Sequence, residues 1–336
     1  MEKSRFGRRL TVIAICIASC SAVPGLVGSA AASTLDRITE YQVPTPQARP
    51  YSITSAPDGY VYFTESDADK IGRINPATGK IKEFDVPTGG SEPYGITVGP
   101  DGNLWFTERF GNRIGRMTPS GHFMEFDLAF QNAQPWDITA ANDGNLYFTE
   151  ENVDAIGRIN SQTFYIQEEP ITQGTFPTGI ASGPDGNVYF TEEIGDKIGR
   201  IHPGGANVLH KFREFTIPTE QALPWDVTAG QDGNVWFSEL SGRNVGRITP
   251  DGHIKEFPVP GEFSGIAGLA PDKLNHIWFT ENDTGLVGYM NLRGHVQRIF
   301  NTSSQDSRPL GITSGSDGNM WFTEADADQI GRAKVR

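Results

Sequence analysis

The sequence predicts an all-β protein, a seven-bladed β-propeller with four-stranded blades, and three observations support this. A tetrapeptide of the form aromatic-Phe-Thr/Ser-Glu recurs seven times, with glutamates 43, 42, 42, 47, 42 and 43 residues apart. Each unit holds four short β-type runs separated by turn signals, with no helical periodicity between them. Repeats of this length with four strands are typical of propeller blades. The repeated glutamates are Glu65, Glu108, Glu150, Glu192, Glu239, Glu281 and Glu324.

The unit that begins at Pro93 illustrates the four strands. We expect strands at 94–98, 104–107, 113–118 and 122–128. Pro-Asp-Gly-Asn at 100–103 and Pro-Ser-Gly at 119–121 predict tight turns between them. The additional residues of the fourth interval fall at 204–210 and predict a longer hairpin loop there.

The two ends of the chain predict how the ring closes. The last unit stops just after its third strand, whereas residues 37–43 precede the first unit and match the fourth-strand pattern of 81–86. We therefore expect the N-terminal strand to complete the seventh blade. Such closure removes an open sheet edge.

Residues 1–32 have the features of a signal peptide: a basic start, an apolar run at 10–18 and an Ala30-Ala31-Ala32 cleavage pattern. We expect the propeller to occupy 33–336 and the protein to be secreted or periplasmic. Ile-Ala-Ser-Cys at 17–20 supports an alternative, a lipid anchor on Cys20. No later stretch approaches 18 consecutive apolar residues, so no transmembrane segment is predicted.

Charge and cysteine content limit the partners. Removal of 1–32 takes four positive charges and one negative charge, which changes the net charge from −13 to −16. A protein this acidic repels phosphate backbones, so we expect no nucleic-acid partner. Both cysteines, Cys16 and Cys20, lie in the leader, so the mature chain is predicted to have no disulfide. We expect a monomer.

Residues that recur in every blade are expected to serve the blade. We predict that each repeated glutamate pairs with the arginine eight positions later, as Glu65 with Arg73 and Glu108 with Arg116. The Asp-Gly-Asn copies are expected to set turn geometry, because they lack the run of oxygen ligands that calcium loops use. We predict no metal site.

Aromatic residues that break the repeat predict a ligand pocket. Trp105, Trp236, Trp278 and Trp321 share a second-strand position and are expected in blade cores. Four others directly follow the prolines that open their units, on the predicted top face, where crossover loops and the loops between strands two and three meet. An alternative interpretation is that they only plug the channel. These four are Tyr51, Tyr94, Trp136 and Trp225.

Polar residues at neighbouring positions are expected to line the same pocket. Histidine, the usual general base, falls at predicted bottom-face turns, and the sequence contains no Ser-His-Asp set or phosphate loop. We therefore assign no catalytic residue. The predicted polar lining is Glu92, Arg109, Asp137, Glu151, Glu193, Asp226 and Arg308.

The runs Pro-Tyr-Gly-Ile-Thr at 93–97, Leu-Trp-Phe-Thr-Glu at 104–108 and Asn-Arg-Ile-Gly-Arg at 112–116 resemble those of the virginiamycin B lyase (streptogramin lyase) family. The resemblance covers residues 36–333. It implies a seven-bladed propeller and an elimination that opens the depsipeptide ring of type B streptogramins with Mg²⁺.

The residues that the resemblance assigns to catalysis do not match. The family has histidines after the opening prolines of the last two blades, where this chain has Ser264 and Leu310. Arg308 and Ala325 stand at or near its two glutamate positions, and Glu92 repeats the Glu-Pro pairing in the wrong blade. We predict no cofactor, with Mg²⁺ needed only if lyase activity is retained.

The leading hypothesis is an exported propeller that binds a small or peptide-like ligand in the top-face aromatic pocket. The alternative is a lyase or cyclising enzyme acting on a natural product, with a displaced acid or base among Glu92, Asp137, Glu151, Glu193 and Asp226. A third hypothesis is a purely structural secreted repeat protein.

Overall fold

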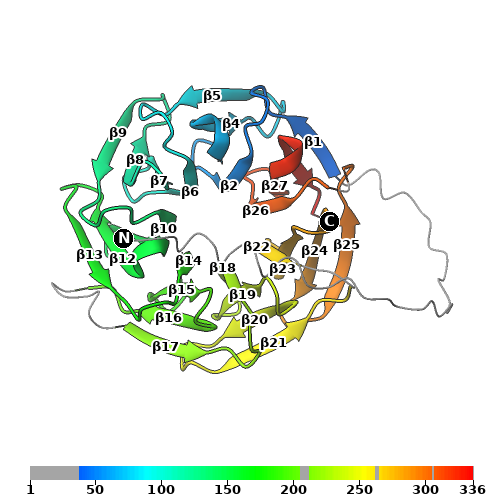
Figure 1. Cartoon of the computed structure of the whole chain (residues 1–336). Coiled ribbons are helices and arrows are strands. Elements are labelled where there is room, and N and C mark those ends of the chain that lie inside the picture. The colour runs from blue at the N-terminus through cyan, green and yellow to red at the C-terminus, as the bar shows by residue number, and fades with distance from the viewer. Residues whose placement is uncertain (1–37, 205–211, 262–264, 305, 336) are drawn as a thin grey trace, which may run out of the picture. The chain divides into compact units, whose positions relative to one another are not determined.

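Seven antiparallel four-stranded sheets form a ring, as predicted (Figure 1). The computed structural model describes residues 38–204, 212–261, 265–304 and 306–335. The predicted signal peptide, Cys20 and most of the long loop at 204–210 lie outside the described residues. Helical structure within the described ranges is limited to the 3₁₀ turns η2 (Ser66–Ala68), η3 (Glu151–Val153) and η4 (Ala325–Ala327). None of the described helices is long and apolar enough to cross a membrane.

The two inner strands of each blade begin and end at equivalent places in the repeat. The innermost strands surround the channel: β2 (Pro50–Ser55), β6 (Pro93–Val98), β10 (Pro135–Ala140), β14 (Pro177–Ser182), β18 (Pro224–Ala229), β22 (Ile266–Pro271) and β26 (Pro309–Ser314). The second strands end at the repeated glutamates: β3 (Val61–Glu65), β7 (Leu104–Glu108), β11 (Asn145–Glu150), β15 (Val188–Glu192), β19 (Val235–Glu239), β23 (His276–Glu281) and β27 (Met320–Glu324).

The two outer strands complete the blades. The third strands carry the repeated glycine: β4 (Lys70–Ile74), β8 (Arg113–Met117), β12 (Ala155–Asn160), β16 (Lys197–Ile201), β20 (Asn244–Ile248), β24 (Leu286–Asn291) and β28 (Gln329–Ala333). The outermost strands are β1 (Ile38–Gln42), β5 (Ile81–Asp85), β9 (Phe123–Asp127), β13 (Ile166–Pro170), β17 (Phe212–Thr216), β21 (Ile254–Pro258) and β25 (Val296–Asn301).

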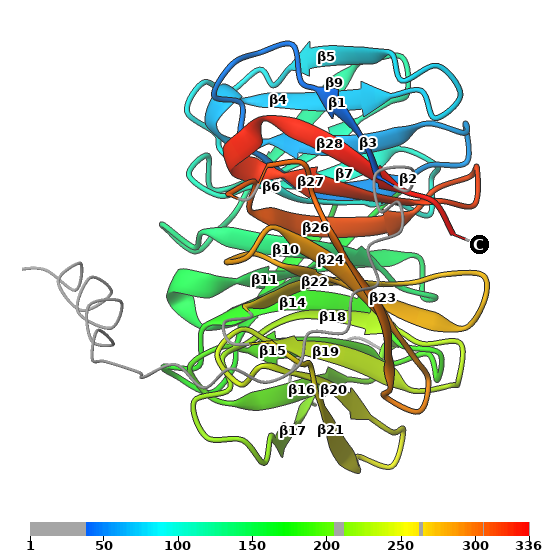
Figure 2. The same ribbon diagram turned by 90° about the vertical axis from the view of Figure 1, so that its right-hand side faces the viewer.

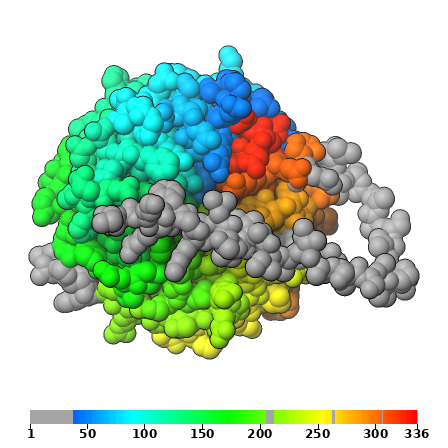
Figure 3. Space-filling model, viewed as in Figure 1, coloured from blue at the N-terminus to red at the C-terminus, as the bar shows by residue number. Residues whose placement is uncertain are grey.

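The N-terminal strand closes the ring, which confirms the prediction. β1 pairs antiparallel with β28, from Ile38 opposite Ala333 to Gln42 opposite Gln329 (Figure 2). Tyr41 stacks on Trp321 with ring centroids 5.6 Å apart. The blue and red ends of the described chain lie side by side in the space-filling view (Figure 3). The seventh blade is therefore built from both ends of the described chain.

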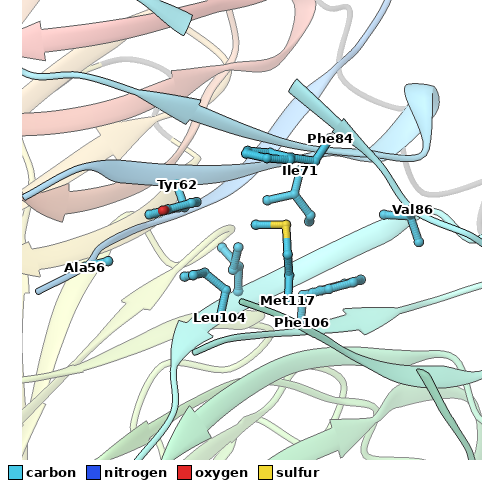
Figure 4. Close-up of a cluster of buried hydrophobic side chains, with 9 residues drawn as sticks. Ala56, Tyr62, Ile71, Phe84, Val86, Leu104, Phe106 and Met117 are labelled. Atoms are coloured by element: carbon cyan, nitrogen blue, oxygen red, sulfur yellow. The ribbon is translucent and has the colours of Figure 1, made fainter. Parts of the chain in front are cut away.

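The core lies between neighbouring blades. Tyr62 and Ile71 of the first blade pack against Leu104, Phe106 and Met117 of the second, and these side chains point toward one another (Figure 4). The repeated glycine allows this packing, because a Cβ on Gly115 would lie 2.1 Å from Cζ of Phe106. Larger residues at this position would displace the ring beneath.

The Asp-Gly hairpins have a second role that the sequence did not reveal. The aspartate that precedes each glycine accepts a hydrogen bond from the aromatic side chain of the second strand. Trp105 donates to Asp101 over 3.0 Å, and Tyr62 donates to Asp58 over 2.7 Å. Buried Trp and Tyr need a partner for their polar atom. The alternation of Trp and Tyr at this position is therefore tolerated, because both residues are donors.

The predicted pairing of repeated glutamates with arginines is wrong. Arg116 instead forms an ion pair with Asp101, with Nε and Oδ2 2.7 Å apart, and Arg73 donates to the carbonyl of Pro119 over 3.1 Å. The carboxyl groups of Glu65 and Glu108 are fully buried, and their oxygens have no hydrogen-bond partner among the described residues. Each arginine extends toward the hairpin end of its blade, away from the glutamate.

The crossover loops and the loops between strands two and three share one face, as predicted. Each residue that follows a repeated glutamate donates its amide to the carbonyl of the residue that precedes an innermost strand. Arg109 donates to Glu92 over 3.0 Å, and Ala325 donates to Arg308 over 3.1 Å. The same bond occurs in all seven blades. We call this the top face, and the Asp-Gly hairpins lie at the other ends of the same strands.

Candidate functional site

A bulge places two residues of each innermost strand at the channel. The ladder between the first two strands is interrupted between Pro50 and Ile53 and at the equivalent place in the other blades. The first residue in each bulge is Tyr51, Tyr94, Trp136, Thr178, Trp225, Ala267 or Leu310. The second is Ser52, Gly95, Asp137, Gly179, Asp226, Gly268 or Gly311.

The four predicted pocket aromatics come together, and we call them the aromatic cap. Tyr51 stacks on Tyr94 with centroids 3.7 Å apart, Tyr94 contacts Trp136 at 4.7 Å, and Trp136 contacts Trp225 edge-on at 5.1 Å. Three of the rings belong to residues with exposures of only 6–9%, while Trp225 is half-buried. The rings cover most of one another's surface, and the ring of Trp225 is the most accessible of the four.

Arg109 is the charged centre beside the cap. Its guanidinium lies 3.5 Å from Glu92 and 3.1 Å from Glu151 of the next blade. It also lies 4.8 Å from the ring centroid of Trp136 and 5.2 Å from that of Tyr94. Burial raises the pKa of Glu92, although the charge of Arg109 opposes this. Three of the predicted polar residues thus form one cluster over the aromatic cap.

Phe110 was not predicted as part of the site. Its side chain is 60% exposed, and the Arg109 guanidinium lies 5.1 Å from its ring centroid. It occupies the loop between strands two and three of the second blade, on the top face. Because this loop residue differs from blade to blade, no repeat pattern marked it in the sequence.

Asp137 and Asp226 lie in the second bulge position, beside the aromatic cap. Oδ2 of Asp137 accepts the amide of Ile180 over 3.1 Å, and Oδ2 of Asp226 accepts the amide of Leu269 over 2.7 Å. Burial raises the pKa of Asp137 to about 6, and burial together with the charge of Asp137 raises the pKa of Asp226 to about 7. Both carboxyl groups can therefore exchange protons near neutral pH.

The two remaining predicted residues are Glu193 and Arg308. Glu193 is half-buried and holds the equivalent of the Arg109 position in the fourth blade. Arg308 is 40% exposed and lies 3.9 Å from Asp326 on the top face. Burial raises the pKa of Tyr51, and the charges of Arg109 and Arg308 oppose this, so Arg308 also acts on the aromatic cap.

The strand register corrects the position of one family histidine. Ile266 opposes Glu281 as Pro309 opposes Glu324, so Ala267 corresponds to Leu310. The sequence comparison used Ser264, which lies outside the described residues. The error arose because the sixth innermost strand opens with isoleucine and offers no proline to align. Ala267, Leu310 and Ala325 are 0%, 3% and 2% exposed and pack with the aromatic cap.

A larger hollow lies on the bottom face, away from these residues. It has a volume of about 430 Å³ and is lined by Asp185, Asn187, Arg200, His202, Arg213 and Pro250. It contains none of the predicted site residues. The channel cavity beside the aromatic cap is smaller, about 70 Å³, and includes Tyr51, Trp136, Asp137, Trp225 and Asp226.

Comparisons with known proteins agree with this geometry. The model of the Virginiamycin B lyase family matches residues 25–265 and 207–336. A structure of a streptogramin B lyase is 34% identical with a TM-score of 0.83, covering 89% of this chain and 97% of that one. Virginiamycin B lyase from Staphylococcus aureus is 32% identical with a TM-score of 0.83, covering 89% and 99%.

Two further matches are a variant of the S. aureus enzyme and a relative that matches only a short stretch of this chain. The S. aureus enzyme has also been solved as a catalytically inactive histidine-to-alanine variant with quinupristin, again at 32% identity, a TM-score of 0.83 and coverage of 89% and 99%. A virginiamycin B lyase from Bacillus licheniformis is 47% identical over 38 residues, which is 11% of this chain and 13% of that protein. Family match, fold and identity agree across nearly the whole propeller, and the chain belongs to the virginiamycin B lyase family.

Proposed function

We propose that this protein is an exported binding member of its family, which takes a small or peptide-like ligand on the top face, over the aromatic cap. The observation that carries the proposal is the cap itself, with the Arg109 cluster and the exposed Phe110 beside it. Aromatic walls with a few fixed charges are typical of ligand sites. Export and a monomeric state remain predictions that accompany the proposal.

The positions that the family resemblance assigns to catalysis argue against lyase chemistry. No histidine occupies the first bulge position of any described innermost strand. Leu310 cannot accept a proton, and Arg308 would repel Mg²⁺ where the resemblance implies a glutamate. The described residues include no group of three or more His, Cys, Asp or Glu that could hold a metal. The residues present therefore do not fit a Mg²⁺ ion.

A peptide-like ligand is favoured by the comparison as well as by the residues. The S. aureus relative was solved with quinupristin, and this chain covers 99% of that protein. A flat ligand ring can stack on Trp225, and the guanidinium of Arg109, whose side chain is 12% exposed, offers a donor at the side. This combination suits a ligand that carries both aromatic and amide groups.

Quinupristin is the probe for the first experiment. We expect a saturable change in tryptophan fluorescence and, by liquid chromatography with mass spectrometry, no linear product with or without Mg²⁺. Trp225→Phe should weaken binding, whereas Trp236→Phe, a core substitution in the same blade, should leave it unchanged. No saturable binding would contradict the proposed ligand class, and ring opening would favour an enzyme.

A second candidate function, a lyase or cyclising enzyme, is favoured by the raised pKa values of Asp137 and Asp226, which burial brings to about 6 and 7. A carboxyl group that titrates near neutral pH can serve as a general acid or base. Untargeted metabolite profiling of a deletion strain distinguishes the two functions. An enzyme predicts that a precursor accumulates, and a binding protein does not.

A further inference from the structure

Six residues at the top of the channel have an uncommon backbone conformation, and we call them the rim residues. Each directly precedes the proline that opens an innermost strand, and each has a positive φ, between 49° and 54°. Residues other than glycine rarely adopt positive φ, and a following proline restricts them further. The strands that they precede follow one another around the channel, from β26 through β2, β6, β10 and β14 to β18 (Figure 1). The rim residues are Arg308, Arg49, Glu92, Gln134, Phe176 and Leu223.

An aspartate of the preceding blade holds the backbone in this conformation. Oδ1 of Asp196 accepts the amide of Leu223 over 3.2 Å, and Oδ2 of the same group accepts the amide of Gln221 over 2.8 Å. The carbonyl of Leu223 accepts the amide of Leu240 over 3.0 Å, the bond that identifies the top face. Equivalent aspartates accept the amides of Arg49, Glu92 and Phe176. The conformation therefore depends on main-chain groups and an aspartate, and it does not require the rim side chains.

The chain uses glycine at a neighbouring position of the same kind but not at the rim. Two positions before the rim residue, five crossover loops have a residue that also has a positive φ: Gln47, Gly90, Asn132, Gly174 and Gln221. Two of these five are glycine, which adopts positive φ without steric strain, whereas none of the six rim residues is. Strained residues are retained where their side chains have a role, typically at ligand sites.

Packing of the blade core does not explain the side chain of Leu223. The core cluster of its blade includes Ala222 and Val227, on either side of it in sequence, but not Leu223 itself. Leu223 is half-buried and lies two residues before Trp225, the most accessible ring of the aromatic cap. A leucine in a strained conformation outside the core is thus placed beside the surface where a ligand is proposed to bind.

Other rim residues act on the aromatic cap directly. Glu92 lies 3.5 Å from the guanidinium of Arg109, which lies 5.2 Å from the ring centroid of Tyr94. Burial raises the pKa of Tyr94, and the charge of Arg49 opposes this rise. The charge of Arg308 also acts on the cap. The rim residues therefore surround the same rings on which the ligand is proposed to rest.

The rim has two chemically different sides. Before β26, β2, β6 and β10 the rim residues are charged or carry an amide, whereas before β14 and β18 they are Phe176 and Leu223. Leu240, bonded through its amide to Leu223, extends the apolar side, and Glu193 places one charge in the same sector. Trp225, on β18, belongs to this side as well. A ligand that covers the cap meets apolar side chains at one end and polar side chains at the other.

We propose that the rim residues determine which ligand the top face takes, and that this ligand is amphipathic. Its apolar group contacts Leu223 and the ring of Trp225, and its amide or hydroxyl groups face the charged and amide residues on the opposite side of the rim. The inference rests on the proposed function, because it concerns the ligand of the same face. It adds the specificity-determining residues and the orientation of the ligand.

Leu223→Gly separates a role in ligand binding from a role in the fold. Glycine relieves the strain of the positive φ, so the melting temperature should equal or exceed that of the unsubstituted protein. Quinupristin, titrated by tryptophan fluorescence, should bind about fivefold more weakly, because an apolar contact is lost. A lower melting temperature would mean that the side chain serves the fold, and it would overturn the inference.

Gln221→Gly is the matched control for this substitution. Gln221 is exposed, has a φ of 56° and donates its amide to the same Asp196 carboxylate as Leu223. Its replacement by glycine relieves the same kind of strain, so the melting temperature should again be equal or higher. The affinity for quinupristin should not change. A loss of affinity equal to that of Leu223→Gly would show that loop flexibility, and not the rim side chain, controls binding.

Leu223→Asn and Leu223→Met test the chemistry of the contact. Asparagine tolerates positive φ but is polar, so Leu223→Asn should fold normally and bind quinupristin as weakly as Leu223→Gly. Methionine keeps an apolar side chain of similar volume, so Leu223→Met should retain the affinity to within about twofold. Full affinity in Leu223→Asn would refute the apolar contact.

The melting temperatures keep this inference separate from the proposed function, because they require no ligand. If the unsubstituted protein binds quinupristin and Leu223→Gly binds it equally well, the proposed function stands and the rim inference fails. If the unsubstituted protein does not bind quinupristin, the proposed ligand class fails. The melting temperature of Leu223→Gly then still decides the rim inference: an equal or higher value supports it, and a lower value overturns it.

Discussion

The repeated glutamates predict that stability falls as the pH rises from 4.5 to about 8, and Glu108→Gln tests this. Glu108 is fully buried, and its oxygens have no hydrogen-bond partner within the described chain. Across Gly115 lies Glu125, whose oxygens accept the amide and hydroxyl of Thr88, each over 3.0 Å. Burial, and then the charge of Glu125, raise the pKa of Glu108 from 4.5 to about 8.

The direction of the change in stability depends on which state, folded or unfolded, binds the Glu108 proton more tightly. Between pH 4.5 and about 8 the folded state keeps the Glu108 proton and the unfolded state releases it. The free energy of unfolding therefore falls as pH rises through this window and levels off above pH 8. At about 1.4 kcal/mol per pKa unit the loss is at most about 5 kcal/mol. Relaxation around the charge reduces it, and we expect about 2–4 kcal/mol.

Urea unfolding followed by circular dichroism at pH 5, 7 and 9 measures this loss. Glutamine does not ionise, so Glu108→Gln should lose less stability between pH 5 and 9 than the unsubstituted protein, by about 2–4 kcal/mol. Glu281→Gln is the matched control, because Ile299 stands opposite Gly288 in its blade, where the others have glutamate. Glu281→Gln should change the pH dependence of the free energy of unfolding less than Glu108→Gln does. Parallel pH profiles for the unsubstituted protein and Glu108→Gln would refute the reasoning.

Three further predictions concern the architecture. Deletion of residues 36–43 should sharply lower the melting temperature in calorimetry, because β28 loses its partner and Trp321 loses Tyr41; an unchanged melt would contradict closure. Trp321→Ala should cost about 3–5 kcal/mol in urea unfolding, and Trp225→Ala clearly less, because only Trp225 is half-buried; equal costs would mean that Trp225 is core packing. Asp101→Ala should lower the free energy of unfolding by about 1–3 kcal/mol, since it removes the hydrogen-bond acceptor of Trp105 and the ion-pair partner of Arg116. Asp127→Ala, at an exposed strand end, is the control and should lower it by less than about 1 kcal/mol. Similar losses for the two variants would contradict the role of the hairpin aspartate.

The blade architecture was predictable because each element is repeated seven times. Strands predicted at 94–98 and 104–107 are found as β6 and β7 within one residue, and the closing strand was identified from its similarity to another fourth strand. Turn signals and spacing are local properties of the chain. Seven copies of a local signal fix both the number of strands and their order.

Side-chain partners were harder to predict, because they depend on direction across a sheet. The spacing from Glu108 to Arg116 suggested an ion pair. In the sheet, however, the two residues lie at opposite ends of neighbouring strands, and Arg116 forms its ion pair with Asp101. Likewise, the residues of the aromatic cap were identified by position, but their mutual packing was visible only in three dimensions. The sixth blade was misaligned where its opening proline is missing.

Ring closure also fixes when the protein can finish folding. Ile38 must pair with Ala333, which is made almost three hundred residues later, so the seventh sheet cannot form until the last strand is available. Contacts this distant in sequence are slow to form, and the six preceding blades must wait with one open side. A chain interrupted during synthesis would keep an unpaired edge that proteases and chaperones recognise. The same strand pairing that stabilises the ring thus distinguishes a finished molecule from an unfinished one.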